Sequence, residues 1–428
     1  MFHGGRVCLE QLAIYIGPSG AIGQHGPTTQ PPMGGLAAVG LFIDRAGMRV
    51  RAKIGIVFST VGPYSAMGRD CRDGADLALL DIAADPACPV TVEAVHADPG
   101  GDPRRYLDAA RDMLREGAVR HIMGAVTSLA RKDMIPLVEK HDGLLWYTCP
   151  YEGFEANENV IYTGACPNQH LMPLFSHLLP RQGKRAYLLG ANYVWGWEMN
   201  RLARDLLTAA GGEVLGERYL PLEETEVSRL IADIARRQPD FILNNLIGPA
   251  SHAFLAAFRD LGLRDPAFRP EACPVLSCDL SECELADLEP GLAEGHLAAA
   301  AYFDSLKSPA NAAFKARVAA LHGPDRRVSA YFEGAYTAVR LFAEAVALAG
   351  SDAPGAVRAA LHGGVFATPH GPLRIDPRTN HAALPFHLGR INGSGGFDII
   401  ASRPSIAADP YLVVDRTGAG RAGLRVVS

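Results

Sequence analysis

Hydroxyl side chains stand at the end of a short apolar segment, residues 121–126. Thr127 and Ser128 lie where this segment passes into a stretch of helical periodicity. The first N–H groups of a helix have no partner inside the helix, so together with a serine hydroxyl they can hold a carbonyl or carboxylate oxygen. The alternative is that Ser128 only caps its helix. The two roles are compatible, because a capping side chain can share its donor with a ligand.

Aromatic side chains gather at two further expected strand ends, one in each half of the chain. They are Trp146, Tyr147 and Tyr151 in the first half, and Tyr193, Trp195 and Trp197 in the second. Each ring alone is explained by packing in the core or at its rim. Two clusters that face each other across a cleft would enclose a small ligand and offer it phenol hydroxyls.

Signatures of catalysis are absent from the sequence. It contains no H-E-x-x-H, no Walker A motif, no G-x-G-x-x-G after a strand and no G-x-S-x-G. Cys273, Cys278 and Cys283 are evenly spaced, but four-residue gaps without a nearby histidine match no metal site. The adjacent Arg131 and Lys132 lie one turn into a helix, where we expect a solvated face. We therefore predict binding without catalysis, metal or cofactor.

Strand and helix patterns alternate twice along the chain, which predicts two α/β sandwich lobes with mostly parallel sheets. Expected strands are residues 53–59, 90–96, two within 121–164, 186–190, 213–219, 241–246 and 274–278. Expected helices are residues 64–84, 103–117, 197–210, 224–237, 249–261, 310–321, 329–348 and 354–361. The strand-like tail, residues 371–414, is expected to add strands to the second lobe.

The length of the chain agrees with this division into two lobes. A length of 428 residues exceeds one ordinary core. A net charge of −5 argues against direct nucleic-acid binding, and the absence of any run of 18 apolar residues argues against a membrane span. Eight scattered cysteines without a C-x-x-C pair indicate reduced thiols and a reducing compartment.

The N-terminal segment differs in composition from the rest of the chain. Residues 1–49 are Gly- and Pro-rich without a period, and we expect a disordered or mis-annotated extension, with Met48 as an alternative start. Residues 33–43 are apolar but lack the basic flank and cleavage site of a signal peptide. This favours a cytoplasmic location, with the periplasm as the alternative.

Several motifs together carry a resemblance to a known family. They are residues 98–103 with Arg105 and Tyr106, Ser128 with Arg131, Lys132 and Pro136, residues 150–155, Ala165 with residues 167–169, Tyr193 with Glu198 and Asn200, Gly371-Pro372, Asn380-His381 and residues 409–411. Over residues 53–414 the sequence resembles type I periplasmic-type solute-binding proteins of the Leu/Ile/Val class. Within that class it is most similar to the amide-sensing negative regulators of aliphatic amidase operons, with urea- and short-amide-binding proteins of transporters as near relatives.

The resemblance implies two lobes that close on a small ligand. Lobe I would comprise residues 50–163 and 299–368, and lobe II residues 164–298 and 369–428. Hinges would fall near residues 162–164, 296–300 and 369–371.

The resemblance also implies a ligand pocket. The family's serine after strand three, its tyrosine and neighbours after strand four and its lobe II tyrosine correspond to Ser128, Tyr147, Pro150 and Tyr193. Val126, Cys149 and Asn245 replace a tyrosine and two threonines of the acetamide regulator, and Thr127 completes the predicted pocket. These replacements change both volume and polarity, so the preferred ligand is expected to differ from acetamide.

The function that follows from the resemblance is regulatory. The chain would bind a small amide or urea-like compound and control amidase expression by holding an RNA-binding antiterminator inactive. The alternative is a substrate-binding protein of an ABC transporter for urea, short-chain amides or branched-chain amino acids. An amino-acid ligand would need a lobe II carboxylate for its ammonium group, for which Glu198 and Asp279 are candidates. An enzyme of amide metabolism is a further rival, and association with a second copy of the chain is left open.

Overall fold

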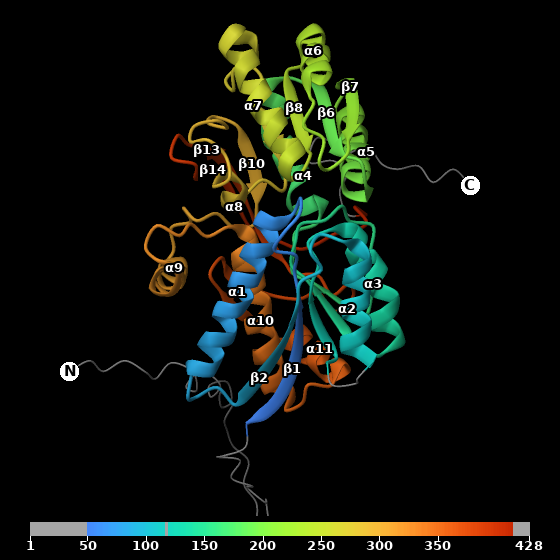
Figure 1. Ribbon diagram of the computed structural model, residues 1–428, viewed down its shortest axis with the longest axis vertical. Helices are drawn as coiled ribbons and strands as arrows, with labels where there is room; N and C mark the ends of the chain where they lie inside the picture. The colour runs from blue at the N-terminus through green and yellow to red at the C-terminus, as the bar shows by residue number, and fades with distance from the viewer. Residues whose placement is uncertain (1–48, 116–118, 414–428) are drawn as a thin grey trace, which may run out of the picture. The chain divides into compact units, whose positions relative to one another are not determined.

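The computed structural model describes residues 49–115 and 119–413, and these described residues belong to one compact unit (Figure 1). The predicted extension, residues 1–49, lies outside the described residues except for Arg49. The chain from residue 50 onward builds two large β-sheets that are flanked by helices. Short β-branched and apolar segments form the strands, as the sequence predicts.

The first sheet has five strands in the order β2-β1-β3-β4-β5, and all of its pairs are parallel. Its elements are β1 (Val50–Val57), α1 (Ser65–Ala84), β2 (Val90–Ala97), α2 (Pro103–Arg115), β3 (His121–Gly124), α3 (Ser128–Lys140), β4 (Leu144–Tyr147) and β5 (Val160–Tyr162). We refer to this sheet and its helices as the first lobe. The carboxyl ends of its parallel strands share one edge, where ligands bind in open α/β sheets.

The second sheet has seven strands in the order β14-β13-β10-β9-β8-β6-β7; β13 pairs antiparallel with both β10 and β14, and the other pairs are parallel. Its elements, the second lobe, are α4 (Leu171–Gln182), β6 (Arg185–Ala191), α5 (Val194–Ala209), β7 (Glu213–Leu220), α6 (Ser228–Arg237), β8 (Phe241–Asn245), α7 (Gly248–Arg264), β9 (Val275–Ser277), α8 (Glu282–Leu285), β10 (Leu297–Ala300), β13 (Leu384–Ile391) and β14 (Phe397–Ile406), with short 3-10 turns at Pro167–Gln169 and Pro266–Phe268.

Three helices that follow β10 return to the first lobe. They are α9 (Pro309–His322), α10 (Ala330–Ala349) and α11 (Pro354–Gly363), and a small hairpin of β11 (Phe366–Thr368) and β12 (Gly371–Leu373) comes next. Helix α10 packs along α1 on one face of the first sheet, while α2 and α3 lie on the other (Figure 1). The two packed helices approach closely at Gly74, where a Cβ would lie 2.1 Å from the Phe332 carbonyl oxygen.

The inner strands β6, β8 and β9 of the second sheet are buried on both faces, which explains why they read as continuous apolar runs. Tyr187 and Leu189 pack with residues of α6 and α7, whereas Ala186 and Leu188 join the core that reaches into the first lobe. Successive strand residues point to opposite faces, so the alternation follows from strand geometry.

The chain crosses between the sheets three times, as the resemblance implies. It crosses after β5, after β10 and between β12 and β13. The second crossing differs from the expected hinge at residues 296–300, because β10 pairs within the second sheet as far as Ala300. Near the third crossing, His381 forms an isolated β-bridge with Tyr162 at the edge of the first sheet. The rings of the two residues also stack, with centroids 4.1 Å apart.

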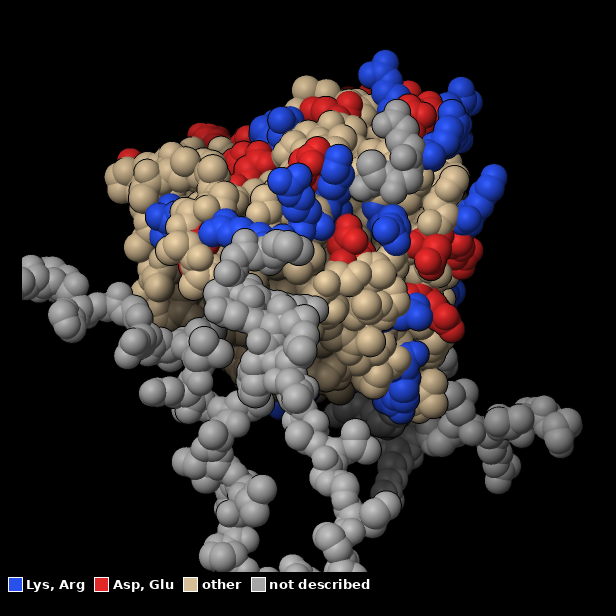
Figure 2. All heavy atoms as spheres, turned by 90° about the horizontal axis from the view of Figure 1, so that it is seen from below, with Lys and Arg blue, Asp and Glu red and all other residues tan. Residues whose placement is uncertain are grey.

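The two-lobed α/β prediction is confirmed in both its layers and its mostly parallel sheets. Among the described residues, no helix is long and apolar enough to cross a membrane. On the face of the molecule drawn in Figure 2, basic and acidic side chains are interspersed rather than gathered into a basic surface.

Candidate functional site

The loop between β3 and α3 carries the hydroxyl side chains that open the predicted site. Thr127 is the N-cap of α3, and its side chain accepts a hydrogen bond from the Ala130 N–H at 3.2 Å. Ser128 is therefore the first helical residue and does not cap the helix. Its hydroxyl donates to the Glu152 carboxylate and accepts a hydrogen bond from Arg131 at 3.2 Å.

Arg131 is fully buried, so its prediction as a residue of a solvated helix face is wrong. Its guanidinium pairs with Glu152 and with Glu155, each at 2.8 Å, and lies 4.6 Å from the Tyr147 ring centroid. Burial lowers its pKa, but Glu152, Tyr147 and Glu155 outweigh this and raise the pKa well above its usual range. A charge buried in this way needs such partners. The cluster fixes the loop after β4 against the start of α3.

The loop after β4 lies directly beside the start of α3. The Tyr147 hydroxyl donates to the Val126 carbonyl oxygen at 2.8 Å, which joins the two loops. Cys149 is buried, and its thiol lies 3.8 Å from the Ala125 carbonyl oxygen. The parallel strands β3 and β4 are neighbours, so the two loops meet as the sequence predicts.

The second lobe contributes the opposite wall through the start of α5. Tyr193 precedes this helix, and its ring makes an edge-on contact with Tyr64 of the first lobe, with centroids 6.4 Å apart. Trp195 is buried, and its indole Nε1 has no hydrogen-bond partner among the described residues. A buried donor without a partner is costly, which marks Nε1 as a group available to a ligand.

A cavity of about 20 Å³ lies between the two lobes. It is lined by Met67, Val126, Ser128, Cys149, Pro150, Tyr193, Trp195, Ile247, Asp279 and Tyr331. A single buried water molecule needs about 10–15 Å³, so a cavity of this size admits only a solute of few non-hydrogen atoms.

Asp279 places a carboxylate in this cavity, in the loop that follows β9. The Ser277 hydroxyl donates to one of its oxygens, and no basic side chain pairs with it among the ion pairs of the described residues. Burial raises the pKa of Asp279 to about 7, although hydrogen bonds from Ser277 and from the backbone N–H groups of Asp279 and Leu280 act against the shift. The carboxylate can accept N–H donors of a ligand.

The two lobes are in contact around the cavity, which is the closed arrangement. Besides the Tyr64–Tyr193 contact, Arg69 pairs with Asp287 at 3.6 Å across the lobes. Gly248 at the start of α7 approaches Pro63 so closely that a Cβ would lie 2.2 Å from the Pro63 carbonyl oxygen. Its φ of +56° also favours glycine.

The structure brings together only part of the predicted pocket. The residues at the cavity wall are Val126, Ser128, Cys149, Pro150 and Tyr193. Thr127 lines a more open hollow of about 380 Å³ at the mouth of the cleft. Tyr147 lies behind the wall with its hydroxyl on Val126, and Asn245 donates to Asn200 at 2.9 Å inside the second lobe.

Other residues of the cavity wall were not predicted to bind the ligand. Asp279 was only a candidate partner for an ammonium group, and Trp195 only a member of an aromatic cluster. Met67, Ile247 and Tyr331 carry no motif. Their place between the lobes follows from the packing of α1, α7 and α10, which no local sequence signal reports.

Comparisons with known proteins agree with this architecture. The "Leu/Ile/Val-binding protein homolog 6" of Brucella abortus (strain 2308) is 24% identical over 356 residues, which cover 79% of this chain and 87% of the relative. A solute binding protein of an ABC transporter from Rhodopseudomonas palustris BisB5, solved with 3,4-dihydroxy benzoic acid, matches with a TM-score of 0.74 at 18% identity and covers 83% of this chain and 98% of that one.

A second solved structure has the same fold. It is the amino acid ABC transporter substrate-binding protein of Pseudomonas fluorescens Pf-5, with a TM-score of 0.72 at 18% identity over 85% of this chain and 98% of that one. The family described as "Periplasmic binding protein domain" matches residues 52–417, almost the whole described region. The chain therefore belongs to the periplasmic binding protein family and is a solute-binding protein related to the Leu/Ile/Val-binding proteins.

Proposed function

We propose that this chain is the substrate-binding receptor of an ABC importer and that it closes on a small amide or urea-like solute. The importer alternative is favoured over the amidase regulator because the similar proteins are named as Leu/Ile/Val-binding and ABC transporter binding proteins. Nothing in these comparisons supports an antiterminator partner. The same relatives favour the periplasm over the cytoplasm as its location.

One observation carries the ligand class: the cavity offers a solute acceptor oxygens as well as an unpaired N–H donor. Asp279 offers a carboxylate, and the Trp195 indole offers an N–H without a partner. Ser128 adds a hydroxyl oxygen from the first lobe, which can accept from the ligand because its hydrogen is donated to Glu152. An amide or urea presents N–H donors and a carbonyl acceptor on one small planar group, so it can satisfy both kinds of wall at once.

The cavity size supports a compact ligand. At about 20 Å³ this cavity by itself leaves no room for an aromatic acid such as those bound by the similar Rhodopseudomonas palustris proteins. Val126 and Cys149 replace polar side chains of the acetamide regulators with apolar or weakly polar ones. The ligand therefore meets a less polar wall on the first-lobe side.

A small α-amino acid is the second candidate, and Asp279 is the observation that favours it. The ammonium group would face this unpaired carboxylate. The carboxylate of the ligand would face the start of α3, where the N–H groups of Ser128 and Leu129 have no partner among the described residues. Glu198, the other candidate, pairs with Arg201 at 2.9 Å and is absent from the cavity wall.

A thermal-shift screen of the purified chain distinguishes these ligands, because a ligand that binds the native state raises its apparent stability. The panel is urea, acetamide, propionamide, alanine, leucine and 4-hydroxybenzoate. We expect stabilisation by an amide or urea. Stabilisation by amino acids alone would overturn the amide assignment in favour of the second candidate.

The Asp279→Asn variant adds an independent criterion. Asparagine keeps an acceptor oxygen for amide N–H groups but loses the charge that pairs with ammonium. Amide affinity should change by less than about tenfold, whereas amino-acid affinity should fall about a hundredfold or more, as expected for loss of a charge partner. A large loss of amide affinity would contradict the proposed acceptor role.

A further inference from the structure

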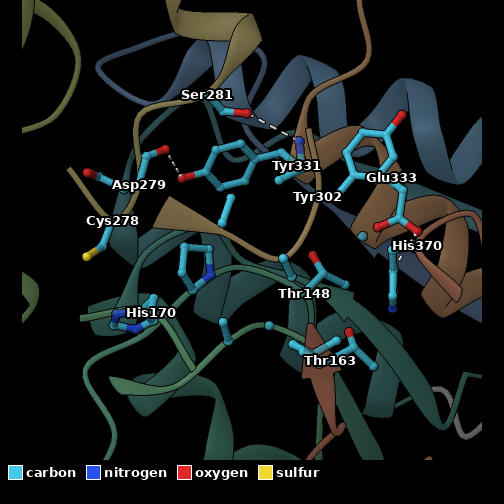
Figure 3. Close-up of a pocket in the computed structure, with 18 of the residues that line it drawn as sticks. Thr148, Thr163, His170, Cys278, Asp279, Ser281, Tyr302, Tyr331, Glu333 and His370 are labelled. Atoms are coloured by element: carbon cyan, nitrogen blue, oxygen red, sulfur yellow. Dashed lines mark hydrogen bonds and ion pairs between the residues drawn. The ribbon is translucent and has the colours of Figure 1, made fainter. Parts of the chain in front are cut away.

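A second cavity, of about 50 Å³, lies where the chain crosses between the lobes (Figure 3). Its walls come from the three crossings and a nearby turn: residues 163–165 after β5, residues 299–302 at the end of β10, Leu384 at the end of the third crossing, and His370 in the turn between β11 and β12. Thr148, residues 278–281 and α10 complete them. Small side chains create the space, since Gly164, Ala165, Ala299, Ala300, Ala301, Ala330 and Gly334 all line it.

Two polar atoms in this cavity wall lack partners. The Thr148 hydroxyl is buried and makes no hydrogen bond among the described residues, and the same is true of His370 Nε2. His370 Nδ1 lies 2.9 Å from the Glu333 carboxylate, and both side chains are 4% exposed. Because Nδ1 faces the carboxylate, Nε2 is the free ring nitrogen. Both unpartnered groups therefore call for an occupant that can hydrogen-bond.

This cavity adjoins the ligand cavity. Pro150, Asp279 and Tyr331 line both of them. The Tyr331 hydroxyl donates to the Asp279 carbonyl oxygen at 2.9 Å, which places the junction at the contact between α10 and the β9–α8 loop (Figure 3). A ligand whose head group faces Asp279 would direct a substituent past this junction.

We propose that the two cavities are compartments of one ligand site, and that the second cavity receives a short chain that ends in a hydrogen-bonding group. The inference rests on the proposed function and refines its substrate class to amides with a distal hydroxyl or second carboxamide. The alanine-rich walls accommodate the methylene groups. The distal group satisfies the Thr148 hydroxyl and His370 Nε2, which an unsubstituted alkyl amide leaves unpaired.

Butyramide and 4-hydroxybutyramide test the proposal by titration calorimetry, because they share a chain and differ in the terminal hydroxyl. Wild-type protein should bind the hydroxy-amide about tenfold more tightly, the factor expected for one buried hydrogen bond to an otherwise unpaired group. Thr148→Val is isosteric and removes the unpartnered hydroxyl. It should abolish most of that preference.

Thr163→Val is the matched control. Thr163 lines the same cavity, but its hydroxyl already donates to the Tyr147 carbonyl oxygen at 3.3 Å. This variant should keep the preference for the hydroxy-amide. Thermal unfolding separates folding defects from binding, and Thr148→Val should melt no lower than wild type, since it removes a buried polar atom without a partner.

The outcomes separate this inference from the proposed function. Equal affinities for the two amides in wild type, or an undiminished preference in Thr148→Val, would overturn the second compartment. Binding of acetamide with rejection of both four-carbon amides would overturn it while the receptor function stands. Failure of every amide and of urea to bind would refute the proposed function itself.

Discussion

Replacing Gly248 by alanine is expected to hold the lobes apart and weaken ligand binding. The alanine Cβ would lie 2.2 Å from the Pro63 carbonyl oxygen, whereas real Cβ contacts stay beyond 3.0 Å. Because the obstacle is a backbone atom of the opposite lobe, no side-chain rotation relieves the clash. The variant can avoid it by opening the cleft, so the closed state alone carries this cost.

The magnitude follows from the closed-state clash. Inserting a methyl group into a well-packed contact costs about 1–3 kcal/mol. A closed state destabilised by this amount lowers the affinity of a ligand that requires closure by about 5- to 150-fold. The left-handed backbone at Gly248, with φ of +56°, adds strain in open and closed states alike. This second effect lowers stability without changing affinity.

Gly211→Ala is the matched control, because Gly211 has φ of +70° and nothing within 4 Å of the added Cβ. Both variants should melt below wild type, while only Gly248→Ala should lose affinity in titration calorimetry with the best ligand of the thermal-shift panel. Small-angle scattering with ligand should show a more open Gly248→Ala variant. Equal affinities of the two variants would refute the inference that this contact belongs to the ligand-bound closed state.

Other substitutions test the cavity wall. Ser128→Ala should weaken ligand binding by about 1–3 kcal/mol in calorimetry, because it removes an acceptor oxygen from the cavity wall and leaves a ligand N–H unpaired; unchanged affinity would exclude Ser128 from the site. Cys149→Thr should move the preference among short amides towards acetamide, and an unaltered ranking would refute its role in selectivity. The raised pKa of Asp279, about 7, means that the native state retains a proton that the unfolded chain releases near pH 4. The free energy of unfolding of the ligand-free protein should therefore fall between about pH 5 and pH 8 more steeply in wild type than in Asp279→Asn. Parallel pH profiles by denaturant titration would show that Asp279 titrates normally.

The sheets and helices could be predicted because their signals are local. The alternation of apolar strands with amphipathic helices places β1, α1 and β2 close to their observed bounds. Helix α6 is the clearest difference. It begins at Ser228 rather than at Glu224, since the Glu224 N–H donates to the Pro221 carbonyl oxygen and the Glu226 side chain accepts from the Ser228 N–H, as in turns.

The prediction for Arg131 failed because burial there depends on distant residues. Its place one turn into α3 is typical of a solvated side chain, and the partners that bury it, Glu152 and Glu155, follow more than twenty residues later. Thr127 rather than Ser128 caps the helix. The two assignments differ by one residue in where the helix starts, and sequence-based predictions of helix boundaries are less precise than that.

The cavity could be predicted only where its residues follow the ends of strands, which includes Tyr193 after β6. Ser128, Cys149 and Pro150 lie at the ends of two strands that pair in parallel, which makes them neighbours. Their positions in the sequence were therefore sufficient to predict that they meet. Asp279 and Tyr331 meet through an interlobe hydrogen bond, and such contacts depend on how the lobes close. Tyr147 and Asn245 were carried over from the family resemblance, which does not specify the internal hydrogen bonds that their polar atoms make here.

Titration calorimetry of the wild-type protein tests the central claim most directly. We predict saturable binding of an amide or urea with one site per chain. The Ser128→Ala variant should weaken this binding, and so should Gly248→Ala, while Gly211→Ala should not. Binding restricted to leucine or 4-hydroxybenzoate, with no heat from any amide or urea, would contradict the account.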